Sequence, residues 1–256
     1  MIHPTAVISP KAIIGADVTI GPYCVINDNV TLGDRCHLHS HVVIDGHATI
    51  GADNEFYPFA AIGQRSQDLK YAGEPTSVLI GDRNTFRENV TVHRGTTAEP
   101  SVVGHDNHFL AYAHVAHDSI VGNHCILSNG ATLGGHVTVA DHVIISGLSG
   151  IHQFCRIGAH AIIGGCSKIV QDVPPFMIAD GHPAALRGLN LVGLQRRSFT
   201  PEAIRSLKTA YKALFLKKEG NLTAQILAFT ENAATQSPEV QHLLEFLATS
   251  ERGIVR

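Results

Sequence analysis

The chain has 256 residues, of which 16% are charged and 44% are hydrophobic, and its net charge is −3. This composition excludes a disordered chain and a globally basic nucleic-acid binder. The sequence has no apolar run near the roughly 18 residues of a membrane-spanning helix and no secretory signal at its start, so we expect a cytoplasmic protein without stable membrane insertion.

From its first residues the sequence repeats with a period of six. An aliphatic or aromatic residue recurs at every sixth position, and Gly often follows it. This period is neither that of a helix nor that of an alternating strand. It predicts a mainly β solenoid in which three hexads close one coil of 18 residues, with coils stacked about 4.8 Å apart. A β-sandwich is the alternative, but its turns would fall at irregular intervals of about 8–12 residues. The repeated positions are Ile2, Ile8, Ile14, Ile20, Ile26, Leu32, Leu38, Ile44, Ile50, Phe56 and Ile62, then Ile80, Phe86 and Val92, then Val103 to Ile169 in the same steps.

Two segments interrupt the period, residues 64–79 and 95–102. We predict that both leave the coil as loops, and long loops on a rigid scaffold often bind substrate. Most of the cysteines stand at the small inward position of a hexad, where Cys packs as a compact hydrophobe, so a catalytic thiol is not expected. The cysteines at this position are Cys24, Cys36, Cys125 and Cys155, whereas Cys166 is one step out of phase.

The period ends after residue 175, and helical spacing follows. We therefore expect a β-solenoid over residues 1–185 and a small α-helical domain over residues 186–256. The first part has a charge balance of −7 and the second a balance of +4. The basic tail is either an ordinary solvated surface or a docking site for an acidic partner or a phosphate ligand.

Three helices are expected in the tail. Thr200 and Pro201 have the residue types of an N-cap and a first helical position, and Gly220 ends that run. A second helix is expected over residues 222–232, and a third begins at Ser237.

His117 and Asp118 stand near a predicted corner of the solenoid. Neighbouring side chains on a flat strand face opposite ways, but at a corner the carboxylate could reach the imidazole and orient it as a general base. The 18-residue register places His136, His152 and Gln153 on the same wall. Polar groups gathered on one wall of an apolar solenoid are the strongest candidate site in the sequence.

A second ladder, His124, His142 and His160, has the same 18-residue spacing. It could bind a metal ion or simply occupy turn positions, whose backbone geometry His tolerates. We favour the turn interpretation and predict no metal site, because no carboxylate or Cys completes a ligand set.

The hexads resemble those of the hexapeptide-repeat acyltransferases, whose fold is a left-handed parallel β-helix and which are typically homotrimers with active sites between subunits. Further strings resemble the family of UDP-N-acetylglucosamine acyltransferases of bacterial lipid A biosynthesis. The resemblance spans the whole chain, and its strings lie at residues 67–76, 92–96, 114–118, 151–155, 164–167, 171–175 and 190–197.

The resemblance implies transfer of a 3-hydroxyacyl chain from the thioester of acyl carrier protein to the 3-hydroxyl of UDP-N-acetylglucosamine, the first step of lipid A biosynthesis. It implies His117 as general base, Asp118 as its orienting partner and the backbone N–H of Gly135 as the oxyanion donor. A sugar hydroxyl does need a positioned base, and a thioester carbonyl needs an N–H donor. No metal, redox or other cofactor is expected, and no nucleic-acid partner.

The resemblance also implies substrate-binding residues. The residues around the acyl group and phosphopantetheine are Gln67, Asp68 and Lys70, and Gly165 is the ruler of acyl length. The residues at the sugar, diphosphate or acyl chain are His114, His136, His152 and Gln153, and His93 lies in a matching string. The residues at the nucleotide are Asn190, Arg196 and Arg197. Three places depart from the pattern: Val192 replaces a Glu, residues 181–184 differ near the far end of the acyl groove, and Lys168 replaces a small residue where it could shorten that groove.

Other functions remain open at this point. The acceptor could carry a 3-amino group in place of the 3-hydroxyl. A trimeric β-helical metalloenzyme of the carbonic anhydrase type would use three His as metal ligands. The related N-acyltransferase carries an extra N-terminal domain, for which hexads starting at Ile2 leave no room. A scaffold without catalysis would explain the repeat but not the clustered His.

Overall fold

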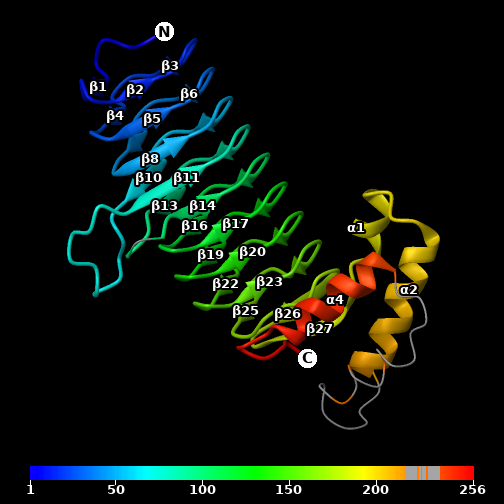
Figure 1. The fold of residues 1–256 in the computed structure, drawn as a ribbon. Helices are drawn as coiled ribbons and strands as arrows, with labels where there is room; N and C mark the ends of the chain where they lie inside the picture. The colour runs from blue at the N-terminus through cyan, green and yellow to red at the C-terminus, as the bar shows by residue number, and fades with distance from the viewer. Residues whose placement is uncertain (98, 217–223, 225, 227–228, 230–236) are drawn as a thin grey trace.

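The structure is a computed structural model that describes all residues except 98, 217–223, 225, 227–228 and 230–236. Most of the chain forms a parallel β-helix whose short strands stack in three sheets (Figure 1). The predicted register is present: His114 pairs with Thr132, and Thr132 pairs with Gly150 in the next coil. The inward position of each hexad is almost fully buried from Ile20 to Ile169. The solenoid predicted from the period of six is therefore confirmed.

Each coil contributes one strand to each sheet, in the order first, second, third. The first sheet contains β1 (Val7–Ile8), β4 (Val25–Ile26), β7 (Val43–Ile44), β10 (Ala61–Gln64), β13 (Thr91–His93), β16 (His114–Val115), β19 (Thr132–Leu133), β22 (Gly150–Ile151) and β25 (Lys168–Ile169). The second sheet contains β2 (Ile13–Ile14), β5 (Val30–Leu32), β8 (His47–Ile50), β11 (Ser77–Ile80), β14 (Ser101–Val103), β17 (Ile120–Val121), β20 (Thr138–Val139) and β23 (Arg156–Ile157). The third sheet contains β3 (Thr19–Ile20), β6 (His37–Leu38), β9 (Glu55–Phe56), β12 (Thr85–Phe86), β15 (His108–Phe109), β18 (Ile126–Leu127), β21 (Ile144–Ile145), β24 (Ile162–Ile163), β26 (Met177–Gly181) and β27 (Ala184–Leu189).

The corners between the sheets turn through residues with positive φ. At the corner between the first and second sheets, Asp118, His136 and Phe154 have φ of 58°, 60° and 65°. Asp and His tolerate this left-handed region better than most side chains do. Because successive coils are in register, the side chains at one corner lie directly above one another. The corners therefore carry ordered ladders of side chains along the β-helix.

The core is filled by aliphatic residues and by one stack of aromatic rings. Phe56, Phe86 and Phe109 lie in consecutive coils of the third sheet, with ring centroids 4.9 and 4.8 Å apart. The cysteines follow the prediction: all are free thiols, Cys166 is exposed, and the four predicted inward cysteines are buried.

Both interruptions leave the β-helix at the corner between the first and second sheets. The first loop covers residues 65–76 between β10 and β11, and the second loop covers residues 94–100 between β13 and β14. Strands β11 and β14 begin before the hexad phase returns, so the loops are shorter than the expected segments 64–79 and 95–102. The first loop projects away from the column of coils (Figure 1).

An antiparallel pair of strands, β26 and β27, ends the β-helix and was not expected from the period. Strand β27 crosses the expected domain boundary at residue 185, and the first helix, α1, covers Leu191–Arg196. Helix α2 (Pro201–Tyr211) begins as predicted, since the Thr200 hydroxyl accepts a hydrogen bond from the Ala203 N–H at 3.1 Å.

Helix α2 continues into one π-helical turn, Lys212–Leu216, and α4 covers Pro238–Ala248, beginning directly after Ser237 as expected. The expected helix over residues 222–232 falls mostly outside the described residues. None of the helices in the described part of the chain is both long and apolar enough to cross a membrane.

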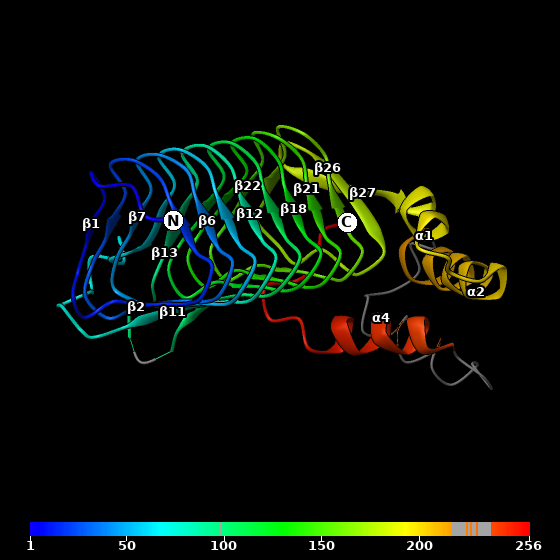
Figure 2. The same ribbon diagram turned by 90° about the horizontal axis from the view of Figure 1, so that it is seen from above.

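The helices cover the C-terminal end of the β-helix (Figure 2). Phe176 and Met177 form one buried cluster with apolar residues of the helices, including Leu207 and Leu243. The last residues then return to the final coil, where the backbone of Asp172 pairs with that of Ile254. The tail thereby closes the open end of the apolar core.

Candidate active site

The predicted pair of His117 and Asp118 is formed at the corner between β16 and β17. The Nδ1 atom of His117 lies 2.7 Å from Oδ2 of Asp118, and their side chains are only 12% and 6% exposed. The positive φ of Asp118 breaks the alternation of the strand, which lets the carboxylate turn back to its neighbour. The sequence-based expectation that a corner would bring these two groups together is confirmed. Nδ1–H donates to the carboxylate, and Nε2 is left as the basic nitrogen.

Several donors surround the Asp118 carboxyl. Burial alone would raise its pKa, but the backbone N–H of Thr96 and the side chain of His117 donate to it, and His136 lies 3.6 Å away. These donors outweigh burial, so the net pKa of Asp118 lies below its usual value. The carboxylate is therefore ionised at neutral pH and can orient the imidazole.

Gly135 lies directly against the imidazole of His117. A Cβ atom at this position would meet Cε1 of His117 at 2.3 Å, so only glycine allows the ring to lie there. The N–H groups of its neighbours Gly134 and His136 donate to Ile151 and His117. Gly135 N–H has no protein acceptor in the part of the chain that the structure describes. An unpaired N–H beside a base has the arrangement of an oxyanion donor.

Two further predicted histidines lie close to His117: His114 is on β16 of the same coil, and His93 is on β13 of the preceding coil. The rings of His93 and His114 meet edge to face with centroids 4.9 Å apart, and Nδ1 of His114 lies 2.7 Å from the Thr91 hydroxyl. Burial, with the neighbouring imidazoles of His114 and His117, lowers the pKa of His93 to about 4. Burial also lowers the pKa of His114. Both rings are therefore neutral at pH 7 and act as hydrogen-bonding groups.

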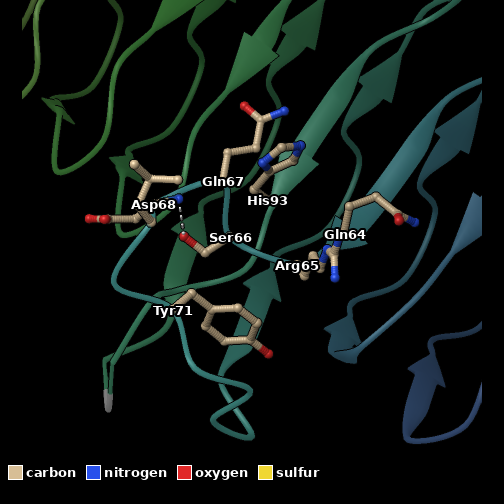
Figure 3. A pocket seen from close by; sticks show the side chains of 8 residues that line it. Gln64, Arg65, Ser66, Gln67, Asp68, Tyr71 and His93 are labelled. Carbon is tan, nitrogen blue, oxygen red and sulfur yellow. Dashed lines mark hydrogen bonds between the residues drawn. The ribbon is translucent and has the colours of Figure 1, made fainter.

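A cavity of about 610 Å³ lies between the first loop and β13 (Figure 3). Among the predicted residues, Gln67, Asp68 and His93 line it, together with Leu69 and Tyr71. Lys70 does not line the cavity, and its backbone N–H donates to the Asp68 carboxylate at 2.9 Å.

A second cavity, of about 420 Å³, lies on the outer face of β19, β22 and β25. Gly135, His152 and Gln153 line it, so it begins beside His117 and continues into the next coils. Lys168 lines the same cavity and is in register with Gly150 of the preceding coil, which has no side chain to fill the space. The cavity thus brings a predicted oxyanion donor and two predicted substrate-binding residues together.

The predicted nucleotide residues lie elsewhere in the chain. Arg196 and Arg197 are at the end of α1, and Arg197 acts electrostatically on His142 and His160, at the corner between the second and third sheets. The Asn190 amide is committed within the chain, since it caps α1 and donates to the His160 carbonyl. A single chain therefore does not bring these residues to His117.

Gly165 is exposed at the corner between the third and first sheets, and a Cβ atom there would meet only the Gly147 carbonyl, at 3.6 Å. The position could accept a larger side chain without backbone strain, so the space beside it is open.

Sequence reasoning missed three residues of the site. Thr96 and Ser66 lie in the two loops, where the hexad register is lost and spacing carries no signal. Phe154 stacks on His136 with ring centroids 4.6 Å apart. It could have been found, because it follows His136 by the same 18 residues that separate His136 from Asp118.

Two groups of side chains among the described residues could hold a metal ion. In the group at the site, the 2.7 Å between Nδ1 of His117 and Oδ2 of Asp118 is a hydrogen bond. Zinc would need about 2.0–2.2 Å to each atom and would force them apart. The two groups are His117, Asp118 and His136, and His37, His39 and Glu55.

The ladder of His124, His142 and His160 is formed as the spacing predicted. Its rings stack in parallel with centroids 4.8 Å apart in both steps, at corner positions with positive φ. This geometry agrees with the interpretation as a ladder of turn residues.

Known proteins resemble the whole chain. A family described as UDP N-acetylglucosamine O-acyltransferase, domain 2, matches residues 172–255, and the bacterial transferase hexapeptide family matches residues 11–46 and 100–135. A protein of Verminephrobacter eiseniae named acyl-[acyl-carrier-protein]–UDP-N-acetylglucosamine O-acyltransferase is 52% identical over 100% of this chain and 99% of its own.

Solved structures agree with these matches. The UDP-N-acetylglucosamine acyltransferase of Bacteroides fragilis is 39% identical, with a TM-score of 0.96 over 100% of both chains. The corresponding enzyme of Arabidopsis is 34% identical, with a TM-score of 0.89 over 100% of both chains. The left-handed parallel β-helix expected from the hexads is the fold of this chain. The chain belongs to the UDP-N-acetylglucosamine O-acyltransferase family and is an acyltransferase.

Proposed function

We propose that this acyltransferase moves a 3-hydroxyacyl chain from acyl carrier protein to the 3-hydroxyl of UDP-N-acetylglucosamine, the first step of lipid A biosynthesis. The observation that carries the proposal is the His117–Asp118 pair packed against Gly135, whose N–H has no acceptor in the described part of the chain. It supplies a base for a hydroxyl and a donor for an oxyanion, which are the two needs of acyl transfer. The name of the Verminephrobacter relative gives the same donor and acceptor for that protein.

In the proposed reaction, Nε2 of His117 takes the proton of the sugar 3-hydroxyl as its oxygen attacks the thioester carbonyl. The carbonyl electrons move onto oxygen, and the resulting oxyanion accepts a hydrogen bond from Gly135 N–H. When the tetrahedral intermediate collapses, the carbon–sulfur bond breaks, and the phosphopantetheine thiolate takes the proton from the imidazolium. Asp118 remains ionised throughout and stabilises the imidazolium. The reaction needs no cofactor beyond the acyl donor.

The two cavities suggest how the substrates divide the site. We assign the cavity of the first loop, with Gln67 and Asp68, to the acyl donor. We assign the cavity with His152 and Gln153 to the acceptor and the nearby acyl chain, where Lys168 limits its length. Lys70 is assigned to phosphopantetheine, and His93, His114 and His136 complete the wall. Acyl carrier proteins are acidic, and the tail has a charge balance of +4.

The expected nucleotide-binding residues fit the proposal if three chains assemble. Arg196 and Arg197 lie at a different corner from His117 in one chain, so we propose that a neighbouring subunit of a homotrimer provides them. The cytoplasmic location expected from the sequence remains part of this proposal. The metalloenzyme and scaffold alternatives have no support in the relatives.

Mass spectrometry of the product tests the proposed function. The protein is incubated with 3-hydroxyacyl carrier proteins of several lengths and with either UDP-N-acetylglucosamine or its 3-amino analogue. We expect an O-acylated product that mild base cleaves, because it is an ester. An amide formed only from the 3-amino analogue would replace the proposed acceptor, and no acyl product from either sugar would contradict the proposed reaction.

A further inference from the structure

The two loops meet through a hydrogen bond between buried hydroxyls. Oγ of Ser66, in the first loop, lies 2.7 Å from Oγ1 of Thr96, in the second loop. The two residues are only 5% and 3% exposed, so water does not compete for this bond. It joins two segments that are 30 residues apart in the chain.

Thr96 also contacts both members of the catalytic pair. Its Oγ1 lies 3.0 Å from Nδ1 of His117, and its backbone N–H donates to Oδ1 of Asp118 at 2.8 Å. On the other side, the Asp118 N–H donates to the Ser101 hydroxyl at 2.8 Å. The second loop therefore holds the side chain of Asp118 and touches the nitrogen that must stay protonated, while β14, which follows the loop, holds the Asp118 backbone.

Ser66 extends this chain of hydrogen bonds to the first loop. Its Oγ accepts the N–H of Asp68 at 3.1 Å (Figure 3). Asp68 lines the cavity assigned to the acyl donor. The position of the donor loop is thus connected, through two hydroxyls, to the imidazole of His117.

The available protons limit how this network can be arranged. Nδ1–H of His117 donates to the ionised Asp118, so the Thr96 hydroxyl cannot donate to Nδ1. The Thr96 oxygen therefore faces Nδ1–H as a second acceptor, 3.0 Å away. The Thr96 and Ser66 hydroxyls share one hydrogen bond, and Ser66 also accepts from Asp68 N–H. The proton on Nδ1 thus has two acceptors, and one of them is linked to the first loop.

We propose that Ser66 and Thr96 are positioning residues, which couple the placement of the first loop to the orientation of His117. The inference rests on the proposed function. A donor that contacts the first loop fixes Asp68 and Ser66, and Thr96 then holds the carboxylate and the imidazole in the geometry that leaves Nε2 free. The network acts on turnover more than on substrate affinity, because neither hydroxyl touches the reacting atoms.

Three variants and one matched control test the network. Thr96→Val removes the hydroxyl and keeps the shape and the backbone N–H, Thr96→Ser restores the hydroxyl, and Ser66→Ala removes the link to the first loop. The control is Thr76→Val in the first loop: Thr76 is 3% exposed, and its hydroxyl has no hydrogen-bond partner among the described residues. It makes the same chemical change at a buried site outside the network.

Kinetics provide the first measurement. We expect Thr96→Val to lower kcat about 10- to 100-fold and Ser66→Ala about 3- to 10-fold, with both KM values within about twofold of wild type. Thr96→Ser should recover most of the turnover, and Thr76→Val should match wild type. Equal losses in Thr96→Val, Thr96→Ser and Thr76→Val would show a merely structural role and overturn the proposal, as would wild-type turnover in Thr96→Val.

The second measurement does not depend on activity. Diethyl pyrocarbonate modifies neutral imidazoles, and peptide mass spectrometry follows its reaction with His117 as a function of pH. We expect the midpoint to fall by about half a pH unit in Thr96→Val and to move in the same direction in Ser66→Ala, since Nδ1–H of the imidazolium loses or holds less firmly its second acceptor. An unmoved midpoint overturns the network. If wild type forms no acyl product, the proposed function fails while this measurement still decides the network.

Discussion

Asp118 illustrates how one backbone angle creates the site. On a flat strand its side chain would face away from His117, but a φ of 58° at the corner turns it back to form a 2.7 Å contact. The corner repeats in the next coil, where His136 has the same conformation and lies 3.6 Å from the carboxylate. The site is thus a local consequence of the turn that every coil makes.

Gly135→Ala tests the close approach of the oxyanion donor to the base. The new Cβ would meet Cε1 of His117 at 2.3 Å, so the imidazole must move. We expect kcat to fall at least about 100-fold, as when oxyanion donors are lost, with little change in melting temperature. Gly147→Ala, whose Cβ would meet the Asn129 carbonyl at 3.2 Å, is the control for a new methyl group at a nearby corner. Steady-state kinetics with near wild-type kcat for Gly135→Ala would refute this geometry.

The sequence predicted those site residues that follow the 18-residue register of the coils. The 18-residue spacing predicted that His117, Asp118 and His136 share one wall. Phe154 was missed, although it follows His136 by the same spacing. Thr96 and Ser66 could not be predicted, because their loops leave the register and only folded coordinates bring their hydroxyls within 2.7 Å.

The strands of the β-helix could be predicted from the hexads, because the inward residue of every hexad is buried in the same way. The antiparallel pair β26 and β27 and the helix α1 could not be predicted in this way. Helix α1 has only six residues, which is too short for a helical period, and it is held by its Asn190 cap. The ladder of His124, His142 and His160 was predicted as a spacing, but the contact of His160 with Phe199 of the tail was not.

His160 makes this ladder sensitive to acid. It stacks between His142 and Phe176, and burial lowers its pKa from 6.5 to about 4, with His142 and Arg197 adding to the effect. Between these pH values the unfolded chain binds more protons than the folded chain, so stability decreases as the pH falls from 6.5 toward 4.

The variant His160→Phe keeps the stack and removes the titrating group. The melting temperature of both proteins should fall when the pH is lowered from about 7 to about 5. We expect the fall to be a few degrees smaller for His160→Phe than for wild type. His47→Phe, at an exposed position on β8, is the control and should fall as wild type does. Equal falls in wild type and His160→Phe, measured by differential scanning fluorimetry, would contradict the assignment.

At the scale of the whole molecule, one chain holds an incomplete set of proposed residues. His117 and Gly135 lie at the corner between the first and second sheets, whereas Arg196 and Arg197 lie beyond the end of the coils, near the corner between the second and third. The sequence of one chain could not predict the distance between these residues in the assembled protein, because in our proposal that distance depends on how the subunits pack.

Mixed trimers test whether neighbouring chains share a site. We expect His117→Ala and Arg196→Ala to be almost inactive alone at low sugar nucleotide concentration. After co-expression in equal amounts, about one quarter of the sites in random trimers would combine an intact His117 with a neighbour's intact Arg196. Recovery of about one quarter of wild-type activity is therefore expected. No recovery would mean that each site uses both residues of one chain.

The most direct test is the turnover of His117→Ala, measured by the mass of the acylated sugar nucleotide under saturating donor and acceptor. We predict a trimer of unchanged size and melting temperature, with kcat reduced at least about 10²- to 10⁴-fold, because the hydroxyl would lose its positioned base. Turnover near that of wild type in a folded His117→Ala protein would contradict the assignment of the base, since His117 is the group held between the Asp118 carboxylate and Gly135.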